Sequence, residues 1–101
     1  VRRATLVLEV NGVRHPLNPP GLVIGRGTEA DLRINDPGIS RRHAQFIVAN
    51  TAEGQTIRVV DLGSTNGIIV DGRKVREADV VDGTRIDIGT THLLVHAPAA
   101  G

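Results

Sequence analysis

The sequence contains no cysteine and only one aromatic residue, and both absences narrow its possible functions. Without cysteine, the 101-residue chain has neither a disulfide framework nor a thiolate metal site, and it has no cysteine nucleophile. Since Phe46 is the only aromatic residue, Val, Ile, Leu and Ala must build the core. No apolar run approaches the roughly 20 residues that span a bilayer, and no signal peptide is visible. The chain also lacks methionine, even at position 1, and we expect it to be a module of a longer protein.

The sequence also lacks an excess of charge of either sign. Twelve basic and eleven acidic residues give a net charge of +1, whereas a duplex-binding domain usually has a clear basic excess. With one aromatic residue, the chain also offers no stacking platform for bases. A nucleic-acid binder is therefore disfavoured. Such a function would use the arginines Arg2, Arg3, Arg41, Arg42 and Arg73.

What the sequence does contain is a series of short β-branched runs separated by turn signals, and no stretch with helical periodicity. The expected strands are residues 5–10, 13–17, 21–26, 31–34, 43–49, 56–62, 67–70, 84–89 and 91–97, with a short one near 73–75. Four dipeptides fit tight hairpin connections: Asn11-Gly12, Asn66-Gly67, Asp71-Gly72 and Asp82-Gly83. Residues 75–83 are expected to form a loop or at most one helical turn. The pattern predicts an all-β sandwich.

Alternation along the runs predicts which side chains face the core. The inward residues are expected to be Leu6, Leu8, Val10, Ala44, Phe46, Val48, Ile86 and Ile88, and the outward ones Glu9, Gln45 and Asp87. One domain of residues 1–101 is expected, with its core at about residues 5–96 and with linkers at 1–3 and 98–101.

Three polar clusters remain at strand ends once turns and core positions are assigned. They are Gly25-Arg26, residues 40–43 and residues 64–66. Loops gather at the ends of a sandwich, and binding groups are usually placed there. The clusters are rich in hydrogen-bond donors and poor in carboxylates, and guanidinium groups bind phosphate through bidentate charge-assisted hydrogen bonds. The clusters therefore indicate an anion-binding site.

The same clusters resemble a known family. "GR" at 25–26, "SRRH" at 40–43 and "GSTNG" at 63–67 are similar, in order and spacing, to the signature of bacterial forkhead-associated (FHA) domains. The resemblance extends from about Leu6 to Val95, and Asp71 and Thr84 depart from it at positions outside the expected phosphate site. It implies a two-sheet antiparallel β-sandwich of about eleven strands whose loops bind phosphothreonine peptides, with no cofactor, no metal and no catalytic residue.

The resemblance also implies a role for each motif residue. Arg26 and Ser40 are expected to contact the phosphate, with Arg41 as a second cation. Residues 41 and 42 should point in opposite directions if both lie in the strand, so Arg42 replaces Arg41 if the strand begins elsewhere. Thr65, or else Ser64, is expected to add a hydroxyl. Three residues are expected to support the site: Gly25 by allowing close chain approach, His43 by joining the loops, and Gly67 by completing the turn that presents Asn66.

Asn66 is expected to hold the peptide backbone just after the phosphothreonine. The expected function is phosphothreonine-peptide recognition in phosphorylation-dependent protein interaction, downstream of a Ser/Thr kinase and without catalysis. The module is expected to be monomeric, to bind neither nucleic acid nor membrane, and to be cytoplasmic, alone or within a larger or membrane-tethered protein. The alternative is a phosphate-independent interaction module that uses a second surface of the same sandwich.

Two other classes of function have weaker support. A hydrolase would use Ser40 and His43 with Asp36 or Asp61, but a spacing of three residues at a strand entrance does not favour a nucleophile–base pair. His92 and His96 share a strand face about 13 Å apart, too far for both to hold one metal ion.

Overall fold

The computed structural model describes residues 6–52 and 54–97, which form eleven strands and no helix. These ranges therefore contain no helix that could cross a membrane. The strands are β1 (Val7–Val10), β2 (Val13–Pro16), β3 (Gly21–Gly25), β4 (Leu32–Arg33), β5 (Ala44–Thr51), β6 (Gly54–Asp61), β7 (Ile68–Val70), β8 (Arg73–Val75), β9 (Glu77–Val80), β10 (Arg85–Ile88) and β11 (Thr91–His96). The linkers expected at 1–3 and 98–101 lie outside the described residues.

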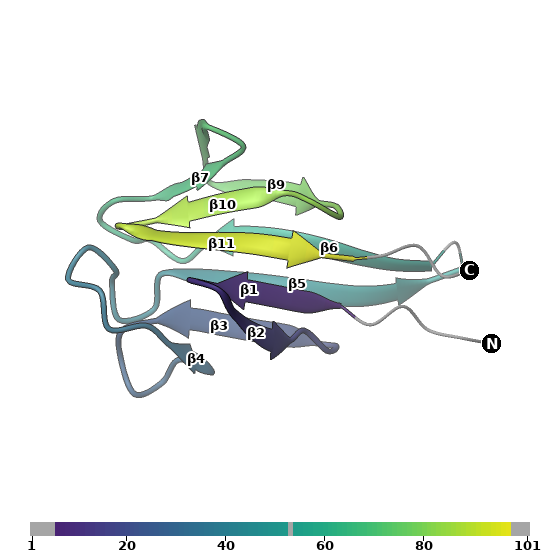
Figure 1. The fold of residues 1–101 in the computed structure, drawn as a ribbon, viewed down its shortest axis with the longest axis horizontal. Coiled ribbons are helices and arrows are strands. Elements are labelled where there is room, and N and C mark those ends of the chain that lie inside the picture. The colour runs from purple at the N-terminus through teal and green to yellow at the C-terminus, as the bar shows by residue number, and fades with distance from the viewer. Residues whose placement is uncertain (1–5, 53, 98–101) are drawn as a thin grey trace.

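The strands form two sheets that face each other (Figure 1). The six-stranded sheet has the order β2-β1-β11-β10-β7-β8, and the five-stranded sheet has the order β4-β3-β5-β6-β9. Every pair is antiparallel except β3 and β4, which run parallel. The predicted two-sheet sandwich of about eleven strands is confirmed.

The core lies between the sheets and is built almost entirely from aliphatic side chains. All the residues predicted to face inward are buried: Leu6, Leu8, Val10, Ala44, Phe46, Val48, Ile86 and Ile88. Phe46 is 0% exposed, and burial of such a side chain contributes about 1.5–3 kcal/mol. The residues predicted to face outward, Glu9, Gln45 and Asp87, are half-buried.

Two of the four turn dipeptides close hairpins as predicted. Asn11-Gly12 joins β1 to β2 and Asp71-Gly72 joins β7 to β8, both with φ values of 49° and 83°, as a type I′ turn requires. The prediction is wrong for Asn66-Gly67 and Asp82-Gly83. They connect β6 to β7 and β9 to β10, which lie in different sheets, so they cross between the layers instead of closing hairpins.

The loop predicted at residues 75–83 is also wrong, because Glu77–Val80 forms the edge strand β9. Its sequence, Glu-Ala-Asp-Val, has little intrinsic preference for a strand. Contacts across the sheet supply the preference instead, since Val80 packs into the core and Arg58 of β6 pairs with Glu77 and Asp79 at 3.3 Å each. The tertiary partner, which local sequence does not reveal, decides this element.

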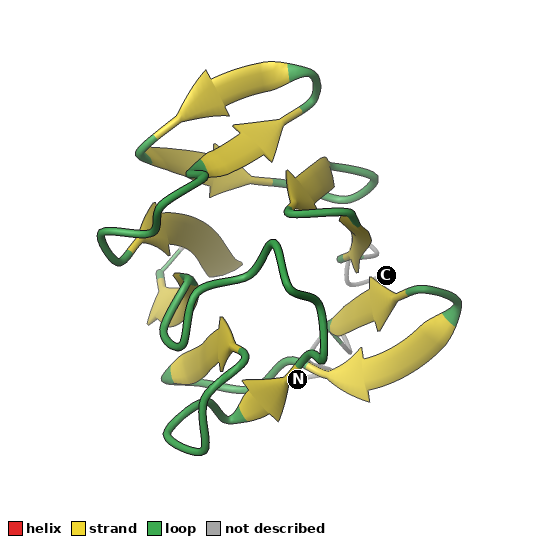
Figure 2. Ribbon diagram, turned by 90° about the vertical axis from the view of Figure 1, so that its left-hand side faces the viewer, coloured by secondary structure: helices red, strands yellow, loops and turns green. Residues whose placement is uncertain are grey.

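The topology brings the three polar clusters to one end of the sandwich. β5 runs antiparallel to both β3 and β6, so the end of β3, the start of β5 and the end of β6 lie at the same edge. Figure 1 shows β3 and β6 pointing to the left and β5 leaving from there, and Figure 2 views this end, where the loops meet. The three clusters therefore lie together because of how β3, β5 and β6 pair.

Candidate functional site

The end of β3 is held against the loop that precedes β5. The Arg26 N–H donates to the Ser40 carbonyl at 2.9 Å, and the Gly27 N–H donates to the Arg41 carbonyl at 3.1 Å. Gly25 is buried, and a Cβ there would lie 1.9 Å from the Arg41 carbonyl oxygen. Only glycine permits this approach, which brings the first two clusters together.

His43 joins the second cluster to the third. Its side chain is 0% exposed, and its Nδ1 accepts from the Ser40 N–H at 3.1 Å, while its Nε2 lies 2.6 Å from the Gly67 carbonyl. Because a backbone N–H needs an acceptor and a carbonyl needs a donor, these partners assign the neutral tautomer with its proton on Nε2. The imidazole thus bridges the two loops.

Two further bonds hold the 62–67 loop beside Ser40. The Ser40 Oγ accepts from the Thr65 N–H at 3.2 Å, and the Asn66 Nδ2 donates to the Gly38 carbonyl at 2.8 Å. The hydroxyl proton of Ser40 has no acceptor within residues 6–52 and 54–97. Ser40 and Asn66 therefore lie on adjoining loops, and the Ser40 hydroxyl keeps a donor for a ligand.

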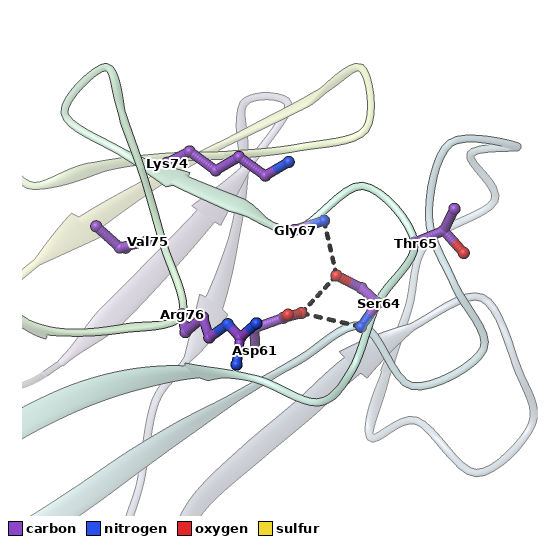
Figure 3. Close-up of a pocket in the computed structure, with 7 residues that line it drawn as sticks. All are labelled: Asp61, Ser64, Thr65, Gly67, Lys74, Val75 and Arg76. Atoms are coloured by element: carbon purple, nitrogen blue, oxygen red, sulfur yellow. Dashed lines mark hydrogen bonds between the residues drawn. The ribbon is translucent and has the colours of Figure 1, made fainter.

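The two candidate hydroxyls of the third cluster differ in their surroundings. The Ser64 hydroxyl donates to the Asp61 carboxylate and accepts from the Gly67 N–H at 2.9 Å. Figure 3 shows Ser64 turned toward Asp61 and Gly67, while Thr65 points away on the other side of the loop. Ser64 is thus used to build the turn, and the exposed Thr65 hydroxyl is open.

Arg41 and Arg42 both precede β5, which begins only at Ala44. Because they lie in a turn, strand alternation does not separate them, and both line a hollow of about 640 Å³ together with Arg26 and Arg33. Arg33 was not predicted as a site residue. Parallel pairing of β4 with β3 brings it beside Gly25, and its Nε donates to the Arg26 carbonyl at 3.1 Å.

A buried carboxylate anchors the loop that leads to Ser40. Asp36 is 5% exposed and accepts from the Gly38 N–H at 2.8 Å, the Thr90 N–H at 2.9 Å, and the Thr90 and Thr91 hydroxyls at 2.8 Å. The bond from Gly38, followed by those from the two threonines, lowers the pKa of Asp36 far below its ordinary value of 3.8. Asp36 therefore ties the site loop to the β10–β11 turn.

Replacing Asp36 by asparagine is expected to lower the urea midpoint of unfolding at neutral pH. Because the folded pKa is depressed, the stability that the carboxylate contributes is full above the unfolded value of 3.8 and is lost as pH falls toward the folded value. Urea unfolding of both proteins should show a gap that is constant from pH 7 to about pH 5 and narrows below about pH 4. A gap that widens toward acid pH would contradict this role.

The arrangements required by the other functional classes do not form in the part of the chain that the structure describes. His43 bonds the Ser40 backbone and not its Oγ, and Asp36 and Asp61 bond other groups. No group of three or more His, Asp or Glu side chains among residues 6–52 and 54–97 could hold a metal ion. Arg73 lies on β8, in the other sheet from the hollow, and Arg2 and Arg3 lie outside the described residues.

Comparison with known proteins gives one consistent family. The family model for the FHA domain matches residues 22–89. The glycogen accumulation regulator GarA of Mycolicibacterium smegmatis is 36% identical over 83 residues, which is 82% of this chain and 50% of GarA. The chain spans 15% of the length of FhaA of Mycobacterium tuberculosis and 61% of that of an oxoglutarate dehydrogenase inhibitor of Corynebacterium efficiens.

Comparison with solved structures gives the same family as comparison with sequences. An FHA domain from a structural and functional analysis of phosphothreonine-dependent FHA domain interactions is 31% identical, with a TM-score of 0.86 over 95% of this chain and 99% of that one. The FhaA FHA domain, crystallised with the intracellular domain of Rv3910, is 33% identical, with a TM-score of 0.83 over 91% of this chain and 100% of that one. The family resemblance carried by the sequence motifs is confirmed: the chain belongs to the FHA domain family.

Proposed function

We propose that the chain is a single FHA domain that recognises phosphothreonine in partner proteins and thereby mediates phosphorylation-dependent interaction. The observation that carries the proposal is that three donor-rich loops lie together at one end of the sandwich. Arg26, Arg41 and the Ser40 hydroxyl keep donors without a protein acceptor among the described residues. Unpaired guanidinium groups at the same end of the sandwich as an open hydroxyl suit a phosphate dianion.

The relatives support the same function. Phosphothreonine-dependent interaction belongs to one matched FHA structure, and assembly with another protein's intracellular domain belongs to a second. They give no support to the phosphate-independent alternative. The named relatives include regulators and inhibitors, which agrees with a module that binds without catalysis. Its action downstream of a Ser/Thr kinase, in the cytoplasm where ATP is available, is part of the proposal.

Each site residue has a proposed role. Arg26, Ser40 and Arg41 bind the phosphate, and Thr65 adds a hydroxyl. Asn66 holds the peptide backbone after the phosphothreonine; its Nδ2 already bonds the Gly38 carbonyl at 2.8 Å, which orients the amide. Three residues support the site. Gly25 lets the end of β3 approach the Arg41 carbonyl, and the His43 imidazole bridges two loops. Gly67 completes the turn by donating its N–H to Ser64.

Backbone NMR tests this placement. Titration of labelled protein with a phosphothreonine peptide is expected to shift the amide signals of residues 26–27, 40–43 and 64–67, and to leave those of the 81–84 connection at the opposite end unchanged. Shifts confined to any other surface would contradict the proposed site.

Removing each of the two neighbouring hydroxyls in turn shows which one binds the peptide and which one stabilises the fold. Thr65→Val is expected to weaken peptide binding about tenfold, since one charge-assisted hydrogen bond contributes about 1.5 kcal/mol or more, and to leave stability unchanged. Ser64→Ala is expected to reduce the free energy of unfolding by about 1 kcal/mol, because the half-buried Asp61 and Gly67 each lose a hydrogen bond to the hydroxyl. Calorimetric titration and urea unfolding of both variants measure the two effects. The reverse pattern would assign the contact to Ser64.

A further inference from the structure

The hollow beside Arg26 contains more positive charge than one phosphate requires. Its lining includes Arg26, Arg33, Arg41 and Arg42, with Glu29 as the one acidic side chain. Four guanidinium groups and one carboxylate leave a formal charge of +3 (4 − 1). A phosphothreonine carries about −1.5 to −2 at neutral pH. Positive charge therefore remains when the phosphate is bound.

The excess is not neutralised by the protein itself. Within residues 6–52 and 54–97, the arginines that pair with carboxylates are Arg14, Arg58 and Arg85, all away from the hollow. The four arginines of the hollow have no carboxylate partner in those ranges, and Arg33 makes one bond, to the Arg26 carbonyl. Like charges that lie together without counter-charges repel one another, so a second anion at this place is favoured.

The position of the hollow indicates which part of a peptide reaches it. Its lining comes from residues 26–29, 33, 35 and 41–42, and includes none of Ser40, Thr65 and Asn66. Asn66 bonds Gly38 and Thr65 bonds Ser40, so the 62–67 loop meets the Ser40 loop outside the hollow. Since Asn66 is proposed to hold the residues after the phosphothreonine, the residues before it run toward Arg33 and Arg42.

We propose that this arginine hollow is a second anion subsite, which takes a carboxylate or phosphate side chain one to three residues before the phosphothreonine. An extended peptide advances about 3.3 Å per residue, so one to three residues cover roughly 3–10 Å, which is comparable to the width of a hollow of about 640 Å³. Arg33 and Arg42 are the specificity-determining residues. The inference rests on the proposed phosphothreonine site and defines its peptide class.

Five peptides of equal length test the subsite by calorimetric titration. The first carries phosphothreonine among alanines, the second adds two aspartates before it, the third adds them after it, and the fourth has phosphoserine before it. The fifth has the two aspartates and an unmodified threonine. The second and fourth peptides are expected to bind about tenfold more tightly than the first, an effect of one partly desolvated charge pair. The third should match the first, and the fifth should show no measurable binding.

Variants assign the effect to the two outer arginines. Arg42→Gln and Arg33→Gln should each reduce the gain, measured in the same variant as the ratio of the affinity for the second peptide to that for the first. Arg73→Gln removes the same charge from β8, outside the hollow, and should keep the full gain. Thermal unfolding shows whether Arg33→Gln is folded. The Arg42 side chain makes no bond to other described residues, so Arg42→Gln tests the subsite without removing a bond within the protein.

The outcomes separate the two proposals. If the first peptide binds and the second binds no better, or if acids after the phosphothreonine give the gain, the subsite is wrong while the phosphothreonine site stands. Full gain in both glutamine variants would also overturn it. If no phosphorylated peptide binds, both proposals fail.

Discussion

Replacing Arg26 by alanine is expected to weaken phosphothreonine-peptide binding by about 100-fold or more and to leave the fold intact. A bidentate guanidinium–phosphate contact contains two charge-assisted hydrogen bonds, each worth about 1.5–3 kcal/mol, and 1.4 kcal/mol corresponds to a factor of ten. The Arg26 side chain is exposed, whereas the bond to the Ser40 carbonyl uses the backbone N–H and is retained in the variant. Calorimetric titration and thermal unfolding measure the two quantities.

Arg73→Ala is the matched control, because this exposed arginine lies on β8 and outside the hollow. It removes the same charge and should change affinity by less than about twofold at physiological salt, where distant exposed charges are largely screened. If Arg26→Ala binds as tightly as this control, the proposed phosphate site is wrong.

Replacing His43 by alanine is expected to reduce the free energy of unfolding by about 3 kcal/mol and to weaken peptide binding as well. The change leaves the half-buried Ser40 N–H and Gly67 carbonyl without their partner, and each lost hydrogen bond costs about 0.5–1.5 kcal/mol. The fully buried ring also leaves a cavity. Since the imidazole bridges the two loops that present Ser40 and Asn66, binding should fall along with stability.

Urea unfolding and titration of the variant measure these effects, with His15→Ala on β2 as the control. The His15 side chain makes no bond to other described residues, and its loss should change stability by about 0.5 kcal/mol or less. A His43→Ala protein with unchanged stability would show that the bridge does not hold the loops.

Most of the sandwich could be predicted from the sequence because strands with one buried face have a side-chain period of two. The inward prediction for Leu6, Leu8 and Val10 succeeds for this reason. The strand β9 could not be predicted, because its preference for a strand comes from β6 and not from its own residues. Turn dipeptides indicate a change of direction, but they do not show whether the chain returns to the same sheet or crosses to the other.

The site shows the same division between local and tertiary information. The motifs predict Arg26, Ser40 and Asn66 as site residues because their types and spacing are readable along the chain. The sequence does not predict the proposed role of Arg33, because β4 has two residues, too few for any period, and only parallel pairing with β3 brings Arg33 beside Gly25. The role of Asp36 depends on hydroxyls more than 50 positions away, at Thr90 and Thr91.

The most direct test of the proposed function is a calorimetric titration of the unaltered protein with one peptide in three forms: phosphothreonine, phosphoserine and unmodified threonine. We expect a Kd on the order of micromolar for the phosphothreonine form, weaker binding of phosphoserine, and at least about a 100-fold loss for the unmodified peptide, because the charge of the phosphate is what the unpaired arginines bind. Equal affinity for the phosphorylated and unmodified forms would contradict the account.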